Sequence, residues 1–166
     1  KFVSTWMTFE KLHADGLARS IGVSNFKPAH LDRLASETGT IPAVNQIQLD
    51  PRIIRAEQRA YDSARGIVTE SYSPLGGQSD GFLTTPLLAR VGERHGKTPG
   101  QVALRWHVQN GLVQLPKSAN PRRLGEHIDV LDFELTPAEI ADWAAIYAGP
   151  RACLDPDHTS HGPFAH

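Results

Sequence analysis

Four short polar sets stand in this sequence at positions where binding chemistry is possible. They combine amides, hydroxyls, one aromatic ring and one cation: Ser24-Asn25, Asn45-Gln46, Tyr72-Ser73 and Lys117-Ser118. Amides and hydroxyls suit a neutral amide-bearing ring, and an aromatic side chain offers a face for stacking. Lysine, serine and the nearby Arg123 are groups that bind phosphate. None of the sets has the carboxylate pair, Cys–His pair or metal-ligand spacing that would indicate catalysis by itself.

Each polar set follows a short apolar stretch that reads as a buried strand. The expected strands cover residues 20–23, 43–49, 67–73 and 112–115. Amphipathic patterns bounded by Pro and Gly predict helices between them, over residues 6–14, 28–37, 55–64, 87–94, 99–109, 122–127 and 136–147. The last of these begins with Thr136 and Glu139 in the spacing of a capping box. A Gly-rich stretch over residues 74–86 is long enough to predict a functional loop.

Strands that alternate with helices favour a parallel sheet covered by helices, in which ligands gather beyond the carboxyl ends of the strands. Two architectures fit this order. A doubly wound sheet would be complete at 166 residues, whereas a (β/α)₈ barrel usually needs about 250, so the chain would supply half of one. No G-x-G-x-x-G motif follows any expected strand, which disfavours the doubly wound alternative.

Composition narrows the class of protein. The 166 residues are 40% hydrophobic with a formal net charge of −1, which gives no reason to expect nucleic acid or an anionic membrane as a partner. One cysteine, Cys153, excludes an internal disulfide and fits a cytoplasmic protein. No apolar run is long enough to span a bilayer. The N-terminus lacks a signal-peptide pattern and an initiator Met, and we expect it to be a cut end.

Five sequence blocks together resemble the aldo-keto reductase family. They are GLARSIGVSNF, AVNQIQLDP, ESYSPLGG, HGKTPGQVALRWHVQNGLVQLPKS and RRLGEHIDVLDFELT, which occur in the family's order and span nearly the whole chain. The resemblance implies the C-terminal half of a (β/α)₈ TIM barrel over residues 1–148, followed by an irregular tail over residues 149–166. It also implies reduction of aldehydes and ketones with NADPH.

The resemblance assigns cofactor roles to ten residues of this chain. Ser24, Asn25 and Gln46 match the positions that hydrogen-bond the nicotinamide carboxamide, and Tyr72 matches the ring that stacks on the nicotinamide. The remaining assignments concern the phosphates and the adenine: Ser73 and Leu75 with the glycine loop at the pyrophosphate, Lys117, Ser118 and Arg123 at the 2′-phosphate, and Glu126 near the adenine. Three groups able to meet a dianion favour NADPH over NADH.

Departures from the family pattern limit what the chain is expected to do alone. His127 stands where the family commonly has Asn beside the adenine, while Gln48 and Asp50 replace a common Glu and His at positions that we interpret as structural. The blocks that carry the family's catalytic Asp, Tyr, Lys and His are absent, and Tyr61, Tyr72 and Tyr147 do not match the catalytic tyrosine. We therefore expect a cofactor-binding half, inactive alone, that acts on a small carbonyl substrate. A missing N-terminal half or a second copy would close the barrel.

Plainer explanations remain beside these assignments. The half barrel could be a non-catalytic nucleotide-binding or assembly module. Ser24 or Asn25 could cap the following helix, Asn45-Gln46 could satisfy buried backbone groups, and Lys117 and Arg123 could be solvated charges. We expect no metal site at the tail histidines, positions 158, 161 and 166, because no rigid element or further ligand accompanies them.

Overall fold

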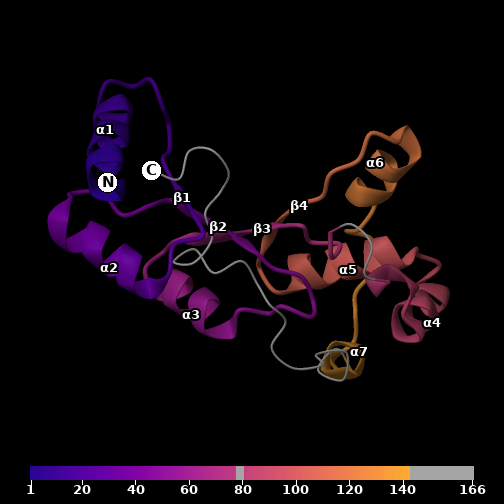
Figure 1. The fold of residues 1–166 in the computed structure, drawn as a ribbon. Coiled ribbons are helices and arrows are strands. Elements are labelled where there is room, and N and C mark those ends of the chain that lie inside the picture. Colours follow the sequence, from indigo (N-terminus) through magenta and orange to yellow (C-terminus); the bar gives the residue numbers. More distant parts are fainter. Residues whose placement is uncertain (78–80, 143–166) are drawn as a thin grey trace. The chain divides into compact units, whose positions relative to one another are not determined.

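The computed structural model describes residues 1–77 and 81–142 (Figure 1). The tail expected over residues 149–166 and the end of the helix expected over residues 136–147 lie outside this part. The strands are β1 (Val23–Ser24), β2 (Val44–Gln48), β3 (Val68–Tyr72) and β4 (Val113–Leu115). The helices are α1 (Phe2–Ala14), α2 (Pro28–Glu37), α3 (Ala56–Ala64), η1 (Phe82–Thr84, a 3₁₀ turn), α4 (Pro86–His95), α5 (Pro99–Gln109), α6 (Pro121–Ile128) and α7 (Pro137–Asp142).

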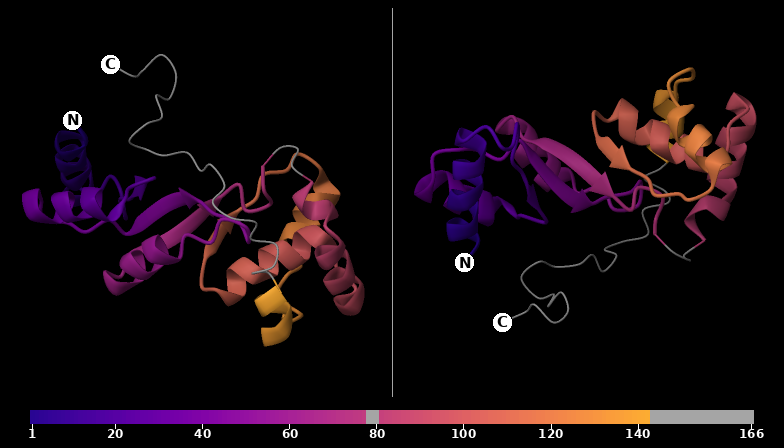
Figure 2. Two further views of the ribbon diagram at one scale, coloured as in Figure 1. Left: turned by 60° about the horizontal axis from the view of Figure 1, so that its bottom comes forward. Right: turned by 90° about the horizontal axis from the view of Figure 1, so that it is seen from above.

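The four strands form a parallel sheet in the order β1-β2-β3-β4. In register, Val23 lies opposite Asn45, and Tyr72 lies opposite Leu115. Figure 2 shows β2 and β3 side by side, and the amide of Val68 donates to the Ala43 carbonyl at 2.9 Å just before β2. The predicted α/β class with about four parallel strands and covering helices is therefore confirmed.

The described chain falls into two compact units. The first comprises residues 1–47 and 56–69, and the second comprises residues 48–55, 70–77 and 81–142. In the first unit α1 packs beside α2 (Figure 1), where Val3, Trp6 and Leu34 form a buried apolar cluster. The indole of Trp6 also donates to the Thr40 carbonyl at 3.1 Å, which ties α1 to the segment that leads into β2.

In the second unit the core surrounds α5, which packs against α4, α6 and β4. Its residues Val102, Ala103, Leu104 and Trp106 are buried. The helix begins at a reciprocal capping box: the Gln101 amide donates to Thr98 Oγ1 at 3.3 Å, and the Thr98 amide donates to Gln101 Oε1 at 3.0 Å. The capping box expected at Thr136 is also present, because the Thr136 amide donates to Glu139 Oε2 at 2.9 Å and the Glu139 amide donates to Thr136 Oγ1 at 3.2 Å.

Side chains alternate in burial along the two longer strands. In β2, Asn45 and Ile47 are buried while their neighbours are half-buried; in β3, Thr69 and Ser71 are buried. Because successive side chains of a strand point to opposite faces, each strand presents one covered and one more open face. Gln46 and Tyr72, both assigned to the cofactor by resemblance, stand on the more open face of their strand.

Several details differ from the expected elements. Helix α1 begins at Phe2 rather than at residue 6. The strand expected over residues 20–23 becomes regular only at Val23, because Gly22 offers no side chain to pack and its Cβ position lies 2.8 Å from the Val44 carbonyl oxygen. The Gly-rich segment expected as a loop over residues 74–86 contains η1, and Pro86 already begins α4.

Candidate functional site

Ser24, Asn25 and Gln46 come together in the first unit, at the carboxyl end of β1. The Gln46 carbonyl accepts hydrogen bonds from the Asn25 amide at 2.9 Å and from Ser24 Oγ at 3.0 Å. The Asn25 side-chain amide in turn donates to Ser24 Oγ at 3.3 Å. Asn25 has a φ of 58°, a left-handed conformation that Asn tolerates better than most residues. The chain thus presents a hydroxyl and an amide side chain at a sharp turn beside β2.

Behind this turn lies a buried polar network centred on Asn45. Its Nδ2 donates to the Phe26 carbonyl at 2.9 Å, and its Oδ1 accepts from the Phe26 amide at 3.3 Å. The same Nδ2 lies 3.4 Å from each carboxyl oxygen of Asp62. The interpretation that Asn45 satisfies buried backbone groups is therefore confirmed, and Gln46 faces the other side of β2.

The Asp62 carboxyl is fully buried on α3 and accepts from side chains of three elements. Gln58 Nε2 donates to it at 2.8 Å and Thr69 Oγ1 donates at 3.1 Å, in addition to the contacts from Asn45. Burial raises the pKa of Asp62 above its ordinary value, and these hydrogen bonds lower it in part.

The helix-capping explanation for Ser24 and Asn25 is wrong. The N-cap of α2 is Lys27, and Pro28 occupies the first helical position. The Lys27 backbone amide donates to His30 Nδ1 at 3.1 Å, which satisfies it without help from the turn. The side-chain hydrogen bonds between Ser24, Asn25 and the Gln46 carbonyl instead hold the turn against β2.

Tyr72, Ser73 and Leu75 lie at the carboxyl end of β3 in the second unit. Ser73 has a left-handed φ of 54°, and its carbonyl accepts from the Gly76 amide at 2.9 Å to close a tight turn. Tyr72 and Leu75 are half-buried. The aromatic ring thus stands immediately before the turn that begins the Gly-rich segment.

A buried ion pair supports this turn. Arg52 donates to Asp50 through Nε at 3.0 Å and through Nη2 at 2.9 Å, and the guanidinium lies 4.3 Å from the centre of the Phe82 ring. A Cβ at Gly76 would clash with Arg52 Nη2. Glycine at position 76 therefore allows the loop to approach the guanidinium, and Asp50 has the structural role that the sequence predicts.

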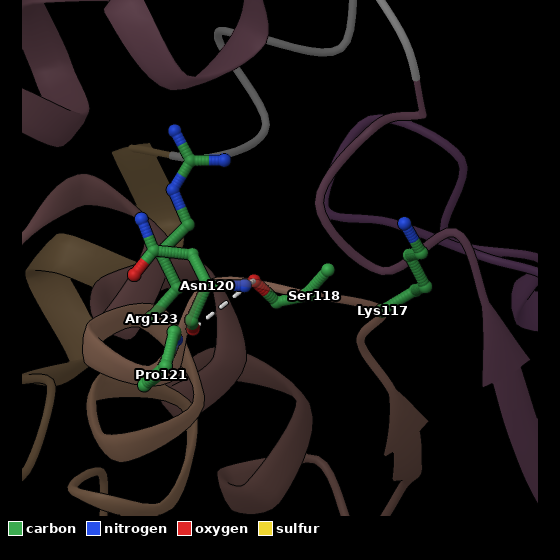
Figure 3. A pocket seen from close by; sticks show the side chains of 6 residues that line it. Lys117, Ser118, Asn120, Pro121 and Arg123 are labelled. Carbon is green, nitrogen blue, oxygen red and sulfur yellow. Dashed lines mark hydrogen bonds between the residues drawn. The ribbon is translucent and has the colours of Figure 1, made fainter.

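A hollow of about 640 Å³ lies between the end of β4 and the start of α6. Its lining comprises Lys117, Ser118, Ala119, Asn120, Pro121 and Arg123. Figure 3 shows Lys117 and Arg123 on either side of Ser118. Ser118 Oγ accepts from the Asn120 amide at 3.0 Å, and Asn120 caps α6 by accepting from the Arg122 amide at 2.9 Å.

The electrostatics of the hollow suit an anion. Both cationic side chains are exposed, and within residues 1–77 and 81–142 neither Lys117 nor Arg123 makes a hydrogen bond or ion pair. The N-terminus of α6 adds partial positive charge from its backbone amides. Lys117, Ser118 and Arg123 therefore form a setting for a phosphate group.

Glu126 takes part in a pair on α6. Its carboxylate accepts from Arg122 Nε at 3.0 Å across one helical turn. This pair distinguishes the two neighbouring arginines, because Arg122 is engaged by Glu126 while Arg123 lines the hollow.

Tyr61 has the properties of a structural tyrosine. Its hydroxyl donates to Asp32, and Arg65 lies 3.6 Å from its ring centre. Burial and the Asp32 carboxylate raise the pKa of Tyr61 to about 12. Because a proton donor works best with a pKa near the working pH, this environment disfavours Tyr61 as a catalytic acid. Tyr147 lies outside the described residues.

Sequence reasoning did not single out Asp62 or Arg52. One pattern could have indicated that Asp62 is buried. The nine residues of α3 include no large aliphatic side chain, so a residue of another type must face the sheet. Nothing in the local sequence indicates that the charged side chain of Arg52 is buried, and only the fold shows it enclosed beside the buried Asp50.

Membrane spans and metal clusters are both missing from the described part of the chain. Its helices lack the length and hydropathy that a membrane span requires. In the same residues, no three or more His, Cys, Asp or Glu side chains gather in a way that could hold a metal ion.

Known proteins resemble this chain over most of its length. The model of the Aldo/keto reductase family matches residues 2–148. An aldo-keto reductase of Mycolicibacterium smegmatis is 47% identical over 156 residues, which cover 94% of this chain and 56% of that protein. Methylglyoxal reductase DkgA of Escherichia coli K12 is 40% identical, covering 94% of this chain and 57% of that protein. The chain thus spans little more than half the length of these relatives.

Solved structures extend the likeness to three dimensions. A mutant of Gox0644, crystallised in complex with NADPH, matches this chain with a TM-score of 0.86 at 39% identity. The match covers 95% of this chain and 58% of that one, and it confirms the predicted partial (β/α)₈ barrel. From the family model, the sequence identities and the shared fold together, this chain belongs to the aldo/keto reductase family.

Proposed function

We propose that this chain is the cofactor-binding part of an NADPH-dependent oxidoreductase that reduces aldehydes or ketones to alcohols. The observation that carries the proposal is the cationic hollow at Lys117, Ser118 and Arg123, next to the start of α6. NADPH differs from NADH by a 2′-phosphate, a dianion that two cations and a hydroxyl can bind. The Gox0644 mutant, whose structure contains NADPH, supports the choice of cofactor.

The other assigned residues serve the remaining parts of the cofactor. Ser24, Asn25 and Gln46 supply the hydroxyl and amide groups that orient a nicotinamide carboxamide, and Tyr72 supplies a ring on which the nicotinamide stacks. Ser73 and Leu75 belong to the turn that covers the pyrophosphate, and Glu126 lies near the adenine. Bound NADPH would supply the hydride for a carbonyl carbon.

The substrate in this proposal is a small carbonyl compound, the class to which methylglyoxal, named for the Escherichia coli relative, belongs. Reduction also needs a proton for the carbonyl oxygen. Among the described tyrosines, Tyr61 is engaged with Asp32, and Tyr72 is assigned to the nicotinamide. We propose that residues outside this sequence supply the acid, from an N-terminal half of the barrel.

A test of the proposal compares two cofactors. In a fluorescence titration of the 166-residue chain, Lys117→Ala and Arg123→Ala should each weaken NADPH about tenfold, because each removes a charge-assisted hydrogen bond to phosphate. NADH affinity should change little. Arg90→Ala is the matched control, since Arg90 is an exposed arginine on α4 that does not line the hollow. Equal losses for NADH and NADPH would contradict the phosphate assignment.

The second candidate function is a non-catalytic nucleotide-binding module. The surroundings of Tyr61 favour this candidate for the chain by itself, because they disfavour Tyr61 as a catalytic acid. An assay of carbonyl reduction by the purified chain, with and without an added N-terminal half of an aldo/keto reductase, separates the two. Turnover only in the mixture agrees with a cofactor-binding part that needs its acid from elsewhere, and NADPH binding with no turnover in either assay agrees with the module. Turnover by this chain alone would contradict the view that it lacks the catalytic acid.

A further inference from the structure

A buried carboxyl lies behind the turn that carries Ser24 and Asn25. Helix α3, all of whose residues are described, buries Asp62 and none of its other side chains. A buried carboxyl is costly unless it is hydrogen-bonded, and Asp62 accepts from Gln58, Thr69 and Asn45. The network therefore occupies the position where a helix would ordinarily place an aliphatic side chain against its sheet.

The network leads from Asp62 to the candidate site in two steps. One hydrogen of Asn45 Nδ2 is directed to the Asp62 carboxyl, at 3.4 Å from each oxygen, and the other to the Phe26 carbonyl at 2.9 Å. With Nδ2 committed to these acceptors, Oδ1 faces the Phe26 amide at 3.3 Å. Asp62 thus selects the orientation of the Asn45 amide that binds both backbone groups of Phe26.

Phe26 borders the strained part of the turn. It directly follows Asn25, whose left-handed φ of 58° is uncommon for a residue other than glycine. Asn45 directly precedes Gln46, whose carbonyl accepts from Asn25 and Ser24. One buried side chain therefore links the two segments that carry the three amide-binding candidates.

We infer that Asp62 and Asn45 are positioning residues, which hold the Ser24–Phe26 turn against β2 in the conformation that binds the nicotinamide amide. This inference rests on the proposed function for its ligand. It assigns no contact with the cofactor to either residue. Their effect is to fix the directions of Ser24 and Asn25, so loss of the network would loosen the nicotinamide end of the site and spare the phosphate hollow.

The experiment uses the full chain and two probes, NADPH and adenosine 2′,5′-bisphosphate, which has the 2′-phosphate but lacks the nicotinamide. Asp62→Asn replaces one acceptor oxygen by an amide nitrogen, which is a donor and cannot accept from Asn45 Nδ2. Asn45→Ala removes both hydrogen bonds to Phe26. Each variant should weaken NADPH by about 3- to 10-fold, the loss expected for one or two hydrogen bonds. Affinity for the bisphosphate should stay unchanged.

Glu57→Gln is the matched control, because it makes the same chemical change at an exposed position of α3. It should leave both affinities unchanged. Equal losses for both probes in Asp62→Asn would overturn the inference, since they would indicate general damage to the fold. Unchanged NADPH affinity in Asp62→Asn and Asn45→Ala would overturn it as well.

A measurement without cofactor separates this inference from the proposed function. In hydrogen–deuterium exchange, Asp62→Asn should increase the exchange of the Asn25 and Phe26 amides while the amides of α2 keep their protection. If the wild-type chain fails to bind NADPH but this local loosening occurs, the proposed function fails and the positioning role stands. If the turn exchanges as in the wild type, the positioning role fails whatever the chain binds.

Discussion

At the level of single residues, the polar side chains discussed above fall into two groups. Some have their hydrogen bonds satisfied within the fold, and others remain accessible to a ligand. Asn45 and Asp62 are buried and hydrogen-bonded to other parts of the fold. Lys117 and Arg123 are exposed at the hollow beside α6. This division matches their proposed roles, because a positioning group must be rigid while a phosphate-binding cation must be accessible.

Asp62 gives a prediction about the pH dependence of stability. Burial raises its pKa in the folded chain above the ordinary value of 3.8, so the folded state binds the proton more tightly than the unfolded state. The stability that Asp62 contributes is therefore greatest in acid and falls as the pH rises from near 3.8 through the raised pKa. Asp62→Asn has no such titration.

The free energy of unfolding of the wild type minus that of Asp62→Asn should consequently decrease with rising pH in this range. Urea unfolding at a series of pH values measures the difference, and other titrating groups cancel because both proteins contain them. Glu57→Gln serves as the exposed control on α3. A difference that grows with pH would show that hydrogen bonds from Gln58, Asn45 and Thr69 outweigh burial.

Among the elements, the helix beginnings differ in how their backbone amides are satisfied. Thr98 and Gln101 form a reciprocal capping box at α5. Thr85, at the same position of α4, makes no side-chain cap, and its hydroxyl has no hydrogen-bond partner among the described residues. Similar sequences, Thr-Pro in both cases, therefore begin helices with different side-chain support.

Thr98→Ala should lower the free energy of unfolding by about 1 kcal/mol, because it removes an N-cap hydrogen bond. Thr85→Ala should cost less than about 0.5 kcal/mol, since no hydrogen bond is lost. Urea unfolding of both variants at one pH makes the comparison. Equal costs would contradict the view that the capping box stabilises α5.

The turn after β3 gives a second prediction about an element. Gly76 and Gly77 both have positive φ values, 86° and 74°, but only the Cβ position of Gly76 lies against other atoms, Arg52 Nη2 first among them. Both substitutions to Ala incur the conformational cost of about 1 kcal/mol. Gly76→Ala also has to displace the guanidinium that pairs with Asp50.

We expect Gly76→Ala to destabilise the chain by at least about 1 kcal/mol more than Gly77→Ala, the usual cost of overpacking. Thermal and urea unfolding measure the two variants side by side. If the two glycines tolerate Ala equally well, Arg52 moves freely and does not support the turn.

For the molecule as a whole, β1 and β4 are the edge strands of the sheet. Apolar side chains on the strands are also partly open: Val68 is 45% exposed, Val113 43% and Leu115 42%. Unpaired strand edges and exposed apolar residues favour association with another chain. The proposed need for a second part of the barrel agrees with this exposure.

The isolated chain should therefore associate or aggregate as its concentration rises, which sedimentation velocity measures. Leu115→Lys should reduce association by placing a charge on an edge strand. Ile128→Lys is the control, because Ile128 is 77% exposed but lies on α6. A monodisperse monomer that unfolds cooperatively would contradict the prediction.

Local sequence rules were enough to predict the order of the four strands and of the α-helices, although they did not predict the 3₁₀ turn η1. Proline at the first helical positions and apolar runs place α2 and α5 with their observed limits, because these rules act within a few residues. The same local order placed the four polar sets after strands. The blocks shared with a known family then indicated the fold, which the comparisons confirm.

The polar residues that hold the site together could be recognised only from contacts made in the folded chain. Asp62 and Asn45 are 17 positions apart, and Arg52 and Phe82 are also distant in the sequence, so neither contact follows from local spacing. From the sequence alone, a carboxyl on a helix such as Asp62 is expected to be solvated. Only the folded structure shows that α3 buries it. The cost of burying a polar group then requires partners from distant segments, and these partners exist only once the chain has folded.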